Sequence, residues 1–147
     1  NNHDSKRNTM IEIRPYASAN YEALKINLEE SDLFNPAIDT REILESKIEA
    51  NPASILVAVV NDEVAGNVYI IEDQWSSFIF RLAVKKGFRR RGIGQTLMEE
   101  AEKRLRQKGI KEVAIFVRDT HQELQDYYIK LGYTPMNVSH KCMYKNL

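Results

Sequence analysis

A glycine-rich turn, RRRGIG at residues 89–94, lies between a strand-like segment and a long amphipathic helix, and it constrains the fold more than any other feature. The first turn of a helix has backbone N–H groups without intrahelical partners, and such groups bind anions. Gly92 and Gly94 have no Cβ, so a ligand can approach the backbone closely. We therefore interpret residues 89–96, called the phosphate loop below, as a binding site for a pyrophosphate group.

Two common phosphate-binding motifs do not match this turn. A Walker loop would have Lys and then Ser or Thr after Gly92, but Ile93 and Gly94 follow it. A dinucleotide fingerprint would have a third glycine at position 97, where Leu97 stands. The spacing thus disfavours both a P-loop and a Rossmann site.

Length and charge limit the class of protein. With 147 residues the chain has the size of about one domain. It has 21 acidic and 21 basic residues, so no overall charge would attract nucleic acid or an anionic membrane. No apolar stretch reaches the roughly 18 residues of a membrane span. The single cysteine, Cys142, excludes an intramolecular disulfide and a cysteine-cluster metal site. We expect a cytoplasmic protein without metal, membrane or nucleic acid partners.

Periodicity predicts the domain and its elements. Residues 1–9 are polar without apolar periodicity, so we predict a flexible leader or an artificial remnant there and a single domain over residues 10–147. Strands alternate apolar and polar residues or form β-branched runs, whereas helices repeat apolar residues every three to four positions. The predicted order is a strand at 11–16, helices after Ser18 and Thr40, strands at 55–60, 64–71 and 77–84, a helix from Gly92 to Gly109, a buried strand at 113–117, a helix at 124–131 and a strand at 138–144.

Three features together resemble the acetyl-CoA site of the GNAT N-acetyltransferase superfamily: Leu82-Ala83-Val84, Arg89-x-x-Gly92-x-Gly94 and Tyr128-x-x-Leu131-Gly132-Tyr133. The resemblance covers about residues 11–147. Within the family, the segment 31–39 is similar to small stand-alone bacterial members of the YpeA type. The resemblance implies an α/β (α+β) fold with a mixed, mostly antiparallel central sheet and about four flanking helices, in the order β-α-α-β-β-β-α-β-α-β-β.

The resemblance implies acetyl-CoA as cosubstrate. In the family a gap beside the strand at 82–84 frees backbone groups for the pantetheine arm. An N–H of Leu82 or a neighbour would then stabilise the oxyanion that forms from the thioester. The implied cofactor contacts are Leu82, Ala83, Val84, Arg89, Arg90, Arg91, Gly92, Ile93, Gly94, Gln95, Thr96 and His121.

Some of these residues have simpler interpretations. Residues 82–84 would also suit a plain core strand, and the arginines 89–91 would suit a solvated face or a contact to RNA phosphates. Backbone N–H groups would do most of the phosphate binding, so we expect the loss of one arginine to weaken it only modestly. Lys86 stands where the family usually has Pro, which loosens the turn without removing a phosphate donor. His121 replaces an Asn that contacts the cofactor in many relatives, and a capping role is equally open.

The family's general acid stands four residues before the glycine of its Leu-Gly-aromatic motif, which is Tyr128 here. This register leaves Tyr127 at a core position. A phenol with a pKa of about 10 can protonate a departing thiolate whose own pKa is about 8.5. The resemblance therefore implies Tyr128 as the catalytic residue.

The sequence identifies no general base. Some relatives that acetylate ribosomal-protein N-termini have Glu directly before the Val-Arg of the fifth strand, but Phe116 precedes Val117-Arg118 here. Glu72 and Asp73 are the nearest acidic candidates, although solvated loop charges explain them as well. Deprotonation at pH 7 costs about 1–1.5 kcal/mol for an α-amine and about 4–5 kcal/mol for a lysine amine. A site without a strong base thus favours the α-amine.

The resemblance implies transfer of an acetyl group from acetyl-CoA to a primary amine of a small molecule or of a peptide or protein N-terminus, by direct attack. The alternatives are a catalytically silent acyl-CoA sensor and an RNA-associated module. Trp75 lines an acceptor pocket or packs beside the sheet, and we expect His140 and Cys142 to pack near the sheet edge. Relatives often dimerise through the last strand, so a homodimer is compatible with the sequence.

Overall fold

The computed structural model describes residues 10–147, so the leader predicted at residues 1–9 lies outside the described chain. The chain divides after Ile115 into two compact units. The first unit contains the sheet and helices α1 to α3, and the second, Phe116–Leu147, contains helix α4. The single domain over residues 10–147 stays a prediction.

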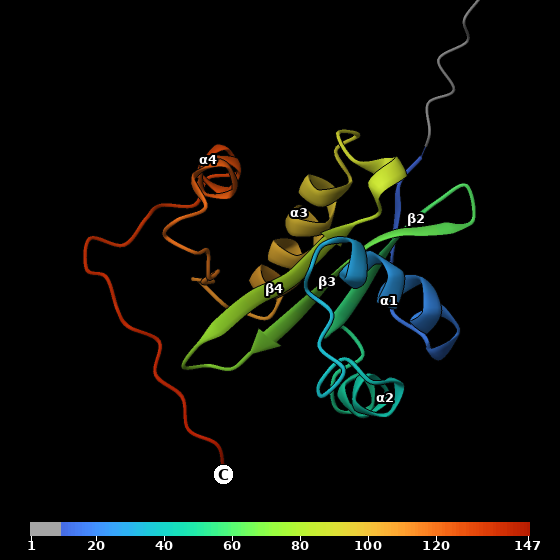
Figure 1. Cartoon of the computed structure of the whole chain (residues 1–147), viewed down its shortest axis with the longest axis horizontal. Helices are drawn as coiled ribbons and strands as arrows, with labels where there is room; N and C mark the ends of the chain where they lie inside the picture. The colour runs from blue at the N-terminus through green and yellow to red at the C-terminus, as the bar shows by residue number, and fades with distance from the viewer. Residues whose placement is uncertain (1–9) are drawn as a thin grey trace, which may run out of the picture. The chain divides into compact units, whose positions relative to one another are not determined.

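The first unit has one antiparallel sheet with the strand order β1-β2-β3-β4 (Figure 1). The β2–β3 hairpin turns at Asn61 and Asp62, whose φ angles of 50° and 63° suit a two-residue turn of the primed type. This turn matches the predicted one. The strands are β1 (Glu12–Pro15), β2 (Ile55–Val60), β3 (Glu63–Glu72) and β4 (Ser77–Val84).

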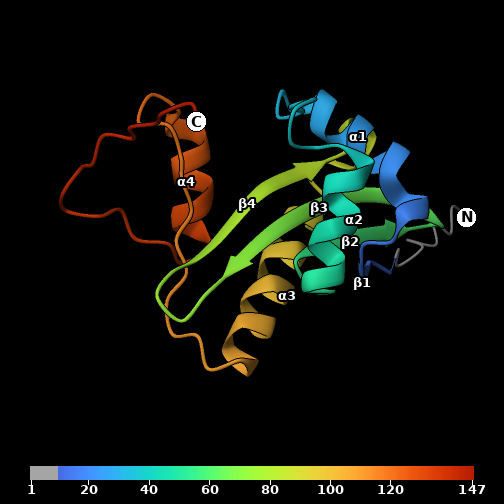
Figure 2. The ribbon, with the colours of Figure 1, turned by 90° about the horizontal axis from the view of Figure 1, so that it is seen from below.

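Helices cover both faces of this sheet (Figure 2), which explains why every residue of β2 is buried. Helices α1 and α2 lie on one face, where Leu24, Leu28 and Leu44 join the core. Helix α3 lies on the other face. The Thr40 hydroxyl accepts from the Ile43 N–H at 3.2 Å and caps α2 as predicted. The bounds are α1 (Tyr21–Glu30), α2 (Arg41–Ala50) and α3 (Ile93–Gln107), with short 3-10 turns η1 (Ser18–Asn20) and η2 (Lys86–Phe88).

The buried strand predicted at 113–117 is reduced to a single parallel bridge between Phe78 and Ala114. Phe116 in this run is 84% exposed. A buried central strand needs a partner along each edge. Among residues 113–117 of the described chain, only Ala114 has a strand pairing, so the segment is not held as a strand over its length.

The second unit contains α4 (Gln122–Lys130), which ends before Gly132 at a φ of 98°. The strand predicted at 138–144 is not formed, and Val138 and Met143 are exposed. The prediction that His140 and Cys142 pack at a sheet edge is therefore wrong, because both side chains are exposed. Over residues 10–147, no helix is both long and apolar enough to cross a membrane.

Candidate active site

The phosphate loop ends in the N-terminus of α3. Gly92 is the N-cap and has the left-handed φ of 79°. The first helical bond joins the Thr96 N–H to the Gly92 carbonyl at 3.0 Å, so the N–H groups of Ile93, Gly94 and Gln95 have no acceptor within the helix. A Cβ on Gly92 would meet no atom within 4 Å. This end of α3 is thus open to an anion, which the helix dipole favours.

The three arginines of the loop have different roles. Arg89 donates from Nε to the Val84 carbonyl at 3.0 Å and from Nη2 to the Glu30 carbonyl at 3.3 Å. Its guanidinium therefore ties the loop to β4 and to the end of α1. Arg90 is exposed, and Arg91 lies over the Phe88 ring, 5.2 Å from its centroid. These two side chains supply positive charge beside the open N–H groups.

Strand β4 contains a β-bulge next to the predicted pantetheine-binding residues. Asn67 pairs with Ala83 and Tyr69 pairs with Phe80, so a single β3 residue faces both Arg81 and Leu82. Arg81 has a left-handed φ of 55°, which costs about 1–2 kcal/mol for a residue other than glycine.

The outer edge of β4 is paired only where the strand begins. Ala114 donates to the Ser77 carbonyl at 2.9 Å and accepts from the Ile79 N–H at 3.1 Å. Past Ile79, no backbone bond to this edge occurs within the described residues of the first unit. The predicted contacts Leu82, Ala83 and Val84 thus lie on a stretch without an outer strand partner in the first unit, where the Val84 carbonyl is taken by Arg89 Nε.

A buried polar network reaches the bulge, and sequence reasoning missed it. The Asp39 carboxylate, in the loop between α1 and α2, is 1% exposed. Its Oδ2 lies 3.4 Å from Arg81 Nη2 and accepts from the Asn35 N–H at 2.8 Å. Its Oδ1 accepts from the Tyr69 hydroxyl at 3.1 Å, and burial together with this carboxylate raises the pKa of Tyr69. The available signal was Arg81 itself, the one charged residue in a largely apolar strand.

Gly66 is a second residue that sequence reasoning missed. A Cβ there would lie 3.0 Å from the Ala83 carbonyl oxygen, 3.1 Å from Leu97 Cδ1 and 3.2 Å from Ile93 Cγ2. The glycine therefore lets the first turns of α3 pack directly on β3 and β4. A lone glycine inside a strand was a usable signal, because it often marks such a close approach.

The second unit contains the predicted general acid and His121. Tyr128 makes edge-on contacts with Tyr127 and Tyr133, at centroid distances of 5.2 and 5.7 Å. Burial, with a smaller effect of Tyr127, raises the pKa of Tyr128 to about 12, so the phenol keeps its proton at neutral pH. His121 Nδ1 accepts from the Leu124 N–H at 3.1 Å, so the imidazole caps α4 and only Nε2 is left for another partner.

The two acidic candidates for a general base are engaged elsewhere. Glu72 forms an ion pair with Lys108 and accepts from Asn51 Nδ2 at 3.1 Å. Asp73 Oδ1 accepts from the Trp75 N–H at 2.9 Å. Glu72 pairs with Ser77, and Leu82 lies five residues further along β4, about 16 Å away at the usual strand rise. Both carboxylates are therefore distant from the bulge.

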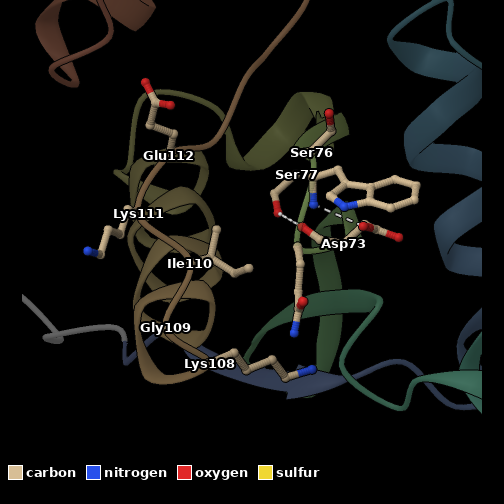
Figure 3. Close-up of a pocket in the computed structure, with 10 residues that line it drawn as sticks. Asp73, Ser76, Ser77, Lys108, Gly109, Ile110, Lys111 and Glu112 are labelled. Atoms are coloured by element: carbon tan, nitrogen blue, oxygen red, sulfur yellow. Dashed lines mark hydrogen bonds between the residues drawn. The ribbon is translucent and has the colours of Figure 1, made fainter.

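An open hollow of about 400 Å³ lies at this same end of the sheet (Figure 3). Asp73, Ser76 and Ser77 of the β3–β4 turn face the segment 108–112, which follows α3. Trp75 also lines the hollow and is 94% exposed, so it does not pack beside the sheet. None of the predicted cofactor residues lines this hollow, and we do not assign it to the active site.

Comparison with known proteins relates this chain to one family of enzymes. The model of the acetyltransferase (GNAT) family matches residues 20–133, a range that extends over both units. An acetyltransferase of Pectobacterium atrosepticum is 32% identical over 123 residues, which cover 84% of this chain and 87% of the relative.

Two solved structures share the fold. Ard1 of Thermoplasma volcanium has a TM-score of 0.74 at 23% identity, with 84% of this chain and 82% of that chain covered. The PaiA N-acetyltransferase of Thermoplasma acidophilum, in complex with coenzyme A, has a TM-score of 0.74 at 21% identity, with coverages of 88% and 93%.

Proposed function

Because this chain belongs to the GNAT acetyltransferase family, we propose that it transfers the acetyl group of acetyl-CoA to a primary amine. The acceptor is a small molecule or the N-terminus of a peptide or protein. The observation that carries the proposal is the open N-terminus of α3, where Ile93, Gly94 and Gln95 have N–H groups without helical acceptors beside a left-handed Gly92. The coenzyme A bound to the PaiA relative supports the choice of ligand.

Acetyl-CoA would be held at two places in the first unit. The pyrophosphate accepts from the free N–H groups of the phosphate loop, with Arg90 and Arg91 adding charge. The pantetheine arm would run along Leu82, Ala83 and Val84, a stretch that has no outer strand partner within the first unit. Arg89 contributes by holding the loop in place, because its guanidinium is bonded to Val84 and Glu30.

The reaction would proceed by direct attack. The neutral amine adds to the thioester carbonyl carbon, and the N–H of Leu82 or a neighbour stabilises the oxyanion of the tetrahedral intermediate. The intermediate collapses, the carbon–sulfur bond breaks, and Tyr128 donates its proton to the coenzyme A thiolate and regains one from water. The nitrogen loses its extra proton to water. Because Glu72 and Asp73 are paired far from the bulge, an α-amine is the favoured acceptor.

Calorimetric titration with acetyl-CoA tests the proposal, and the chain offers a matched pair of variants. Gly92→Asp places a carboxylate in the open N-terminus of α3, where it would repel the pyrophosphate. Gly109→Asp is the control. Gly109 also has a left-handed φ, of 80°, and a Cβ there would meet no atom within 4 Å, but it lies just beyond the C-terminal end of α3. The two positions have nearly the same left-handed φ, so the difference between the variants reports the anion site.

We expect the parent to bind acetyl-CoA with micromolar affinity, a free energy of about −8 kcal/mol. Gly92→Asp should weaken this binding at least about tenfold more than Gly109→Asp. A parent that binds no acetyl-CoA would refute the acyltransferase. Binding without turnover of any amine, in a screen of peptides and small amines, would point instead to a silent acyl-CoA sensor.

A further inference from the structure

The bulge in β4 changes the side of the sheet to which Arg81 points. Phe80 packs against the core beneath α1 and α2, so the next residue of a regular strand would point to the α3 face. The extra residue of the bulge leaves Arg81 on the same side as Phe80, where its Nη2 reaches Asp39. The bulge and the ion pair therefore depend on each other.

The conformation of Arg81 needs support, because its φ of 55° is strained and persists only where neighbours hold it. Asn67 Nδ2 donates to the Arg81 carbonyl at 3.1 Å and supports the backbone. The guanidinium has Asp39 as its ion-pair partner, while its Nε is buried without a hydrogen bond among the described residues. Asp39 is thus the main group that holds the side chain.

Asp39 is itself rigid. The Asn35 N–H and the Tyr69 hydroxyl fix its two carboxylate oxygens, and its own carbonyl accepts from the Tyr21 hydroxyl at 2.8 Å. Bonds from a loop residue and from β3 therefore fix the buried carboxylate, and a bond from α1 fixes the backbone of the same residue. Such a group can hold a strained strand residue in one orientation.

We propose that Asp39 is a positioning residue for acetyl transfer: through Arg81 it holds the β4 bulge so that a backbone N–H of residues 81–82 meets the thioester oxygen. This inference rests on the proposed function. It gives the Asp39 carboxylate, which lies outside the phosphate loop, a role in positioning the backbone for catalysis. Without the carboxylate, the bulge relaxes and this N–H no longer aligns with the carbonyl, while the anion site at α3 is unaffected.

The test measures the thioester carbonyl directly, so it needs no acceptor amine. Acetyl-CoA labelled with ¹³C at the carbonyl is bound to the full chain, and isotope-edited infrared spectroscopy records its stretching frequency. In the parent, the N–H bond should shift the stretch below that of free acetyl-CoA. Asp39→Asn should lose at least half of this shift, with a Kd within about twofold of the parent's, because the pyrophosphate site is separate.

A control and a second variant separate positioning from stability. Glu12→Gln removes a carboxylate from the exposed Glu12–Arg14 pair on β1 and should leave the carbonyl stretch unchanged. Leaving Arg81 buried without its partner can unfold the chain. The double variant Asp39→Asn with Arg81→Gln removes both charges, and it too should lose the shift. Once an acceptor is known, Asp39→Asn and the double variant should each lower kcat at least about tenfold, with little change in the KM for acetyl-CoA.

Each outcome decides the inference. A folded Asp39→Asn variant, or the folded double variant, with the parent's carbonyl stretch would overturn it. A parent that binds acetyl-CoA without any shift would also overturn it, while the proposed acyltransferase would stand. A parent that does not bind acetyl-CoA would instead refute the proposed function.

Discussion

Tyr128 has two properties that bear on its proposed role as proton donor to a leaving thiolate. Its ring is held by edge-on contacts with Tyr127 and Tyr133, which limit its orientation. Burial raises its pKa to about 12, so the phenol holds its proton at neutral pH but is a weaker acid than a thiol with a pKa of about 8.5. Tyr127 has the same chemical group at the next position, and burial raises its pKa as well. Substitution can therefore compare two adjacent phenols.

We expect Tyr128→Phe to lower kcat about 100-fold, the usual contribution of a general acid, with the Kd of acetyl-CoA unchanged. The measurement is thiol release from acetyl-CoA with an amine found by screening. Tyr127→Phe is the control, and its kcat should stay close to that of the parent. Equal rates in the parent and in Tyr128→Phe would show that Tyr128 is not the acid.

Helix α3 places the phosphate loop, and its distance from the sheet depends on one missing side chain. Ile93 and Leu97, in the first turns of α3, pack against the position where Gly66 would have a Cβ. The Ala83 carbonyl lies within 3.0 Å of the same point and belongs to backbone, which cannot move away easily. Any larger residue at position 66 must push the helix outward.

Gly66→Ala should lower the free energy of unfolding by about 1–3 kcal/mol, the usual cost of overpacking. It should also weaken acetyl-CoA binding, because the first turn of α3 moves. Gly87→Ala is the matched control, since a Cβ there would meet no atom within 4 Å, and it should change stability by less than about 0.5 kcal/mol. Urea unfolding and calorimetry measure the two effects. A Gly66→Ala variant with the parent's free energy of unfolding and acetyl-CoA affinity would mean that α3 does not pack closely on β3 and β4 at this position.

The stability of the molecule should fall at alkaline pH because burial keeps several tyrosines neutral above the pH at which unfolded tyrosines ionise. Tyr16 is 3% exposed, and burial raises its pKa to about 12. Burial raises the pKa of Tyr69 as well. An unfolded tyrosine ionises near pH 10. The stabilisation is thus complete below pH 10 and is lost as the pH rises toward 12, by about 2–3 kcal/mol for Tyr16 alone.

Tyr16→Phe tests this expectation, because the Tyr16 hydroxyl has no hydrogen-bond partner among the described residues. At pH 7 the variant should be as stable as the parent or up to about 1 kcal/mol more stable, since an unpaired buried hydroxyl is removed. Between pH 10 and 11, its free energy of unfolding should fall less than that of the parent. Urea unfolding at several pH values gives both quantities, with Tyr144→Phe, at an 89% exposed position, as the control. A steeper alkaline loss in Tyr16→Phe would contradict the pKa assignment.

Local patterns were sufficient for eight elements, β1 to β4 and α1 to α4. The Asn61-Asp62 turn, the Thr40 cap and the glycines at both ends of α3 act over a few residues, so they can be recognised in a linear sequence. The segments 113–117 and 138–144 have strand-like patterns as well, yet they form only the bridge at Ala114 in the described chain. A strand depends on a partner strand, and its own pattern cannot supply one.

By itself, the sequence determined the family motifs: the glycines of the phosphate loop and the register that selects Tyr128. Such motifs are contiguous because backbone N–H groups at one helix end must all face one ligand. Only the tertiary structure decided that Arg89 anchors the loop and that Asp39, Tyr69 and Arg81 form one buried network. These residues are far apart along the chain, and burial makes their charges and hydroxyls interact strongly, which no local pattern encodes.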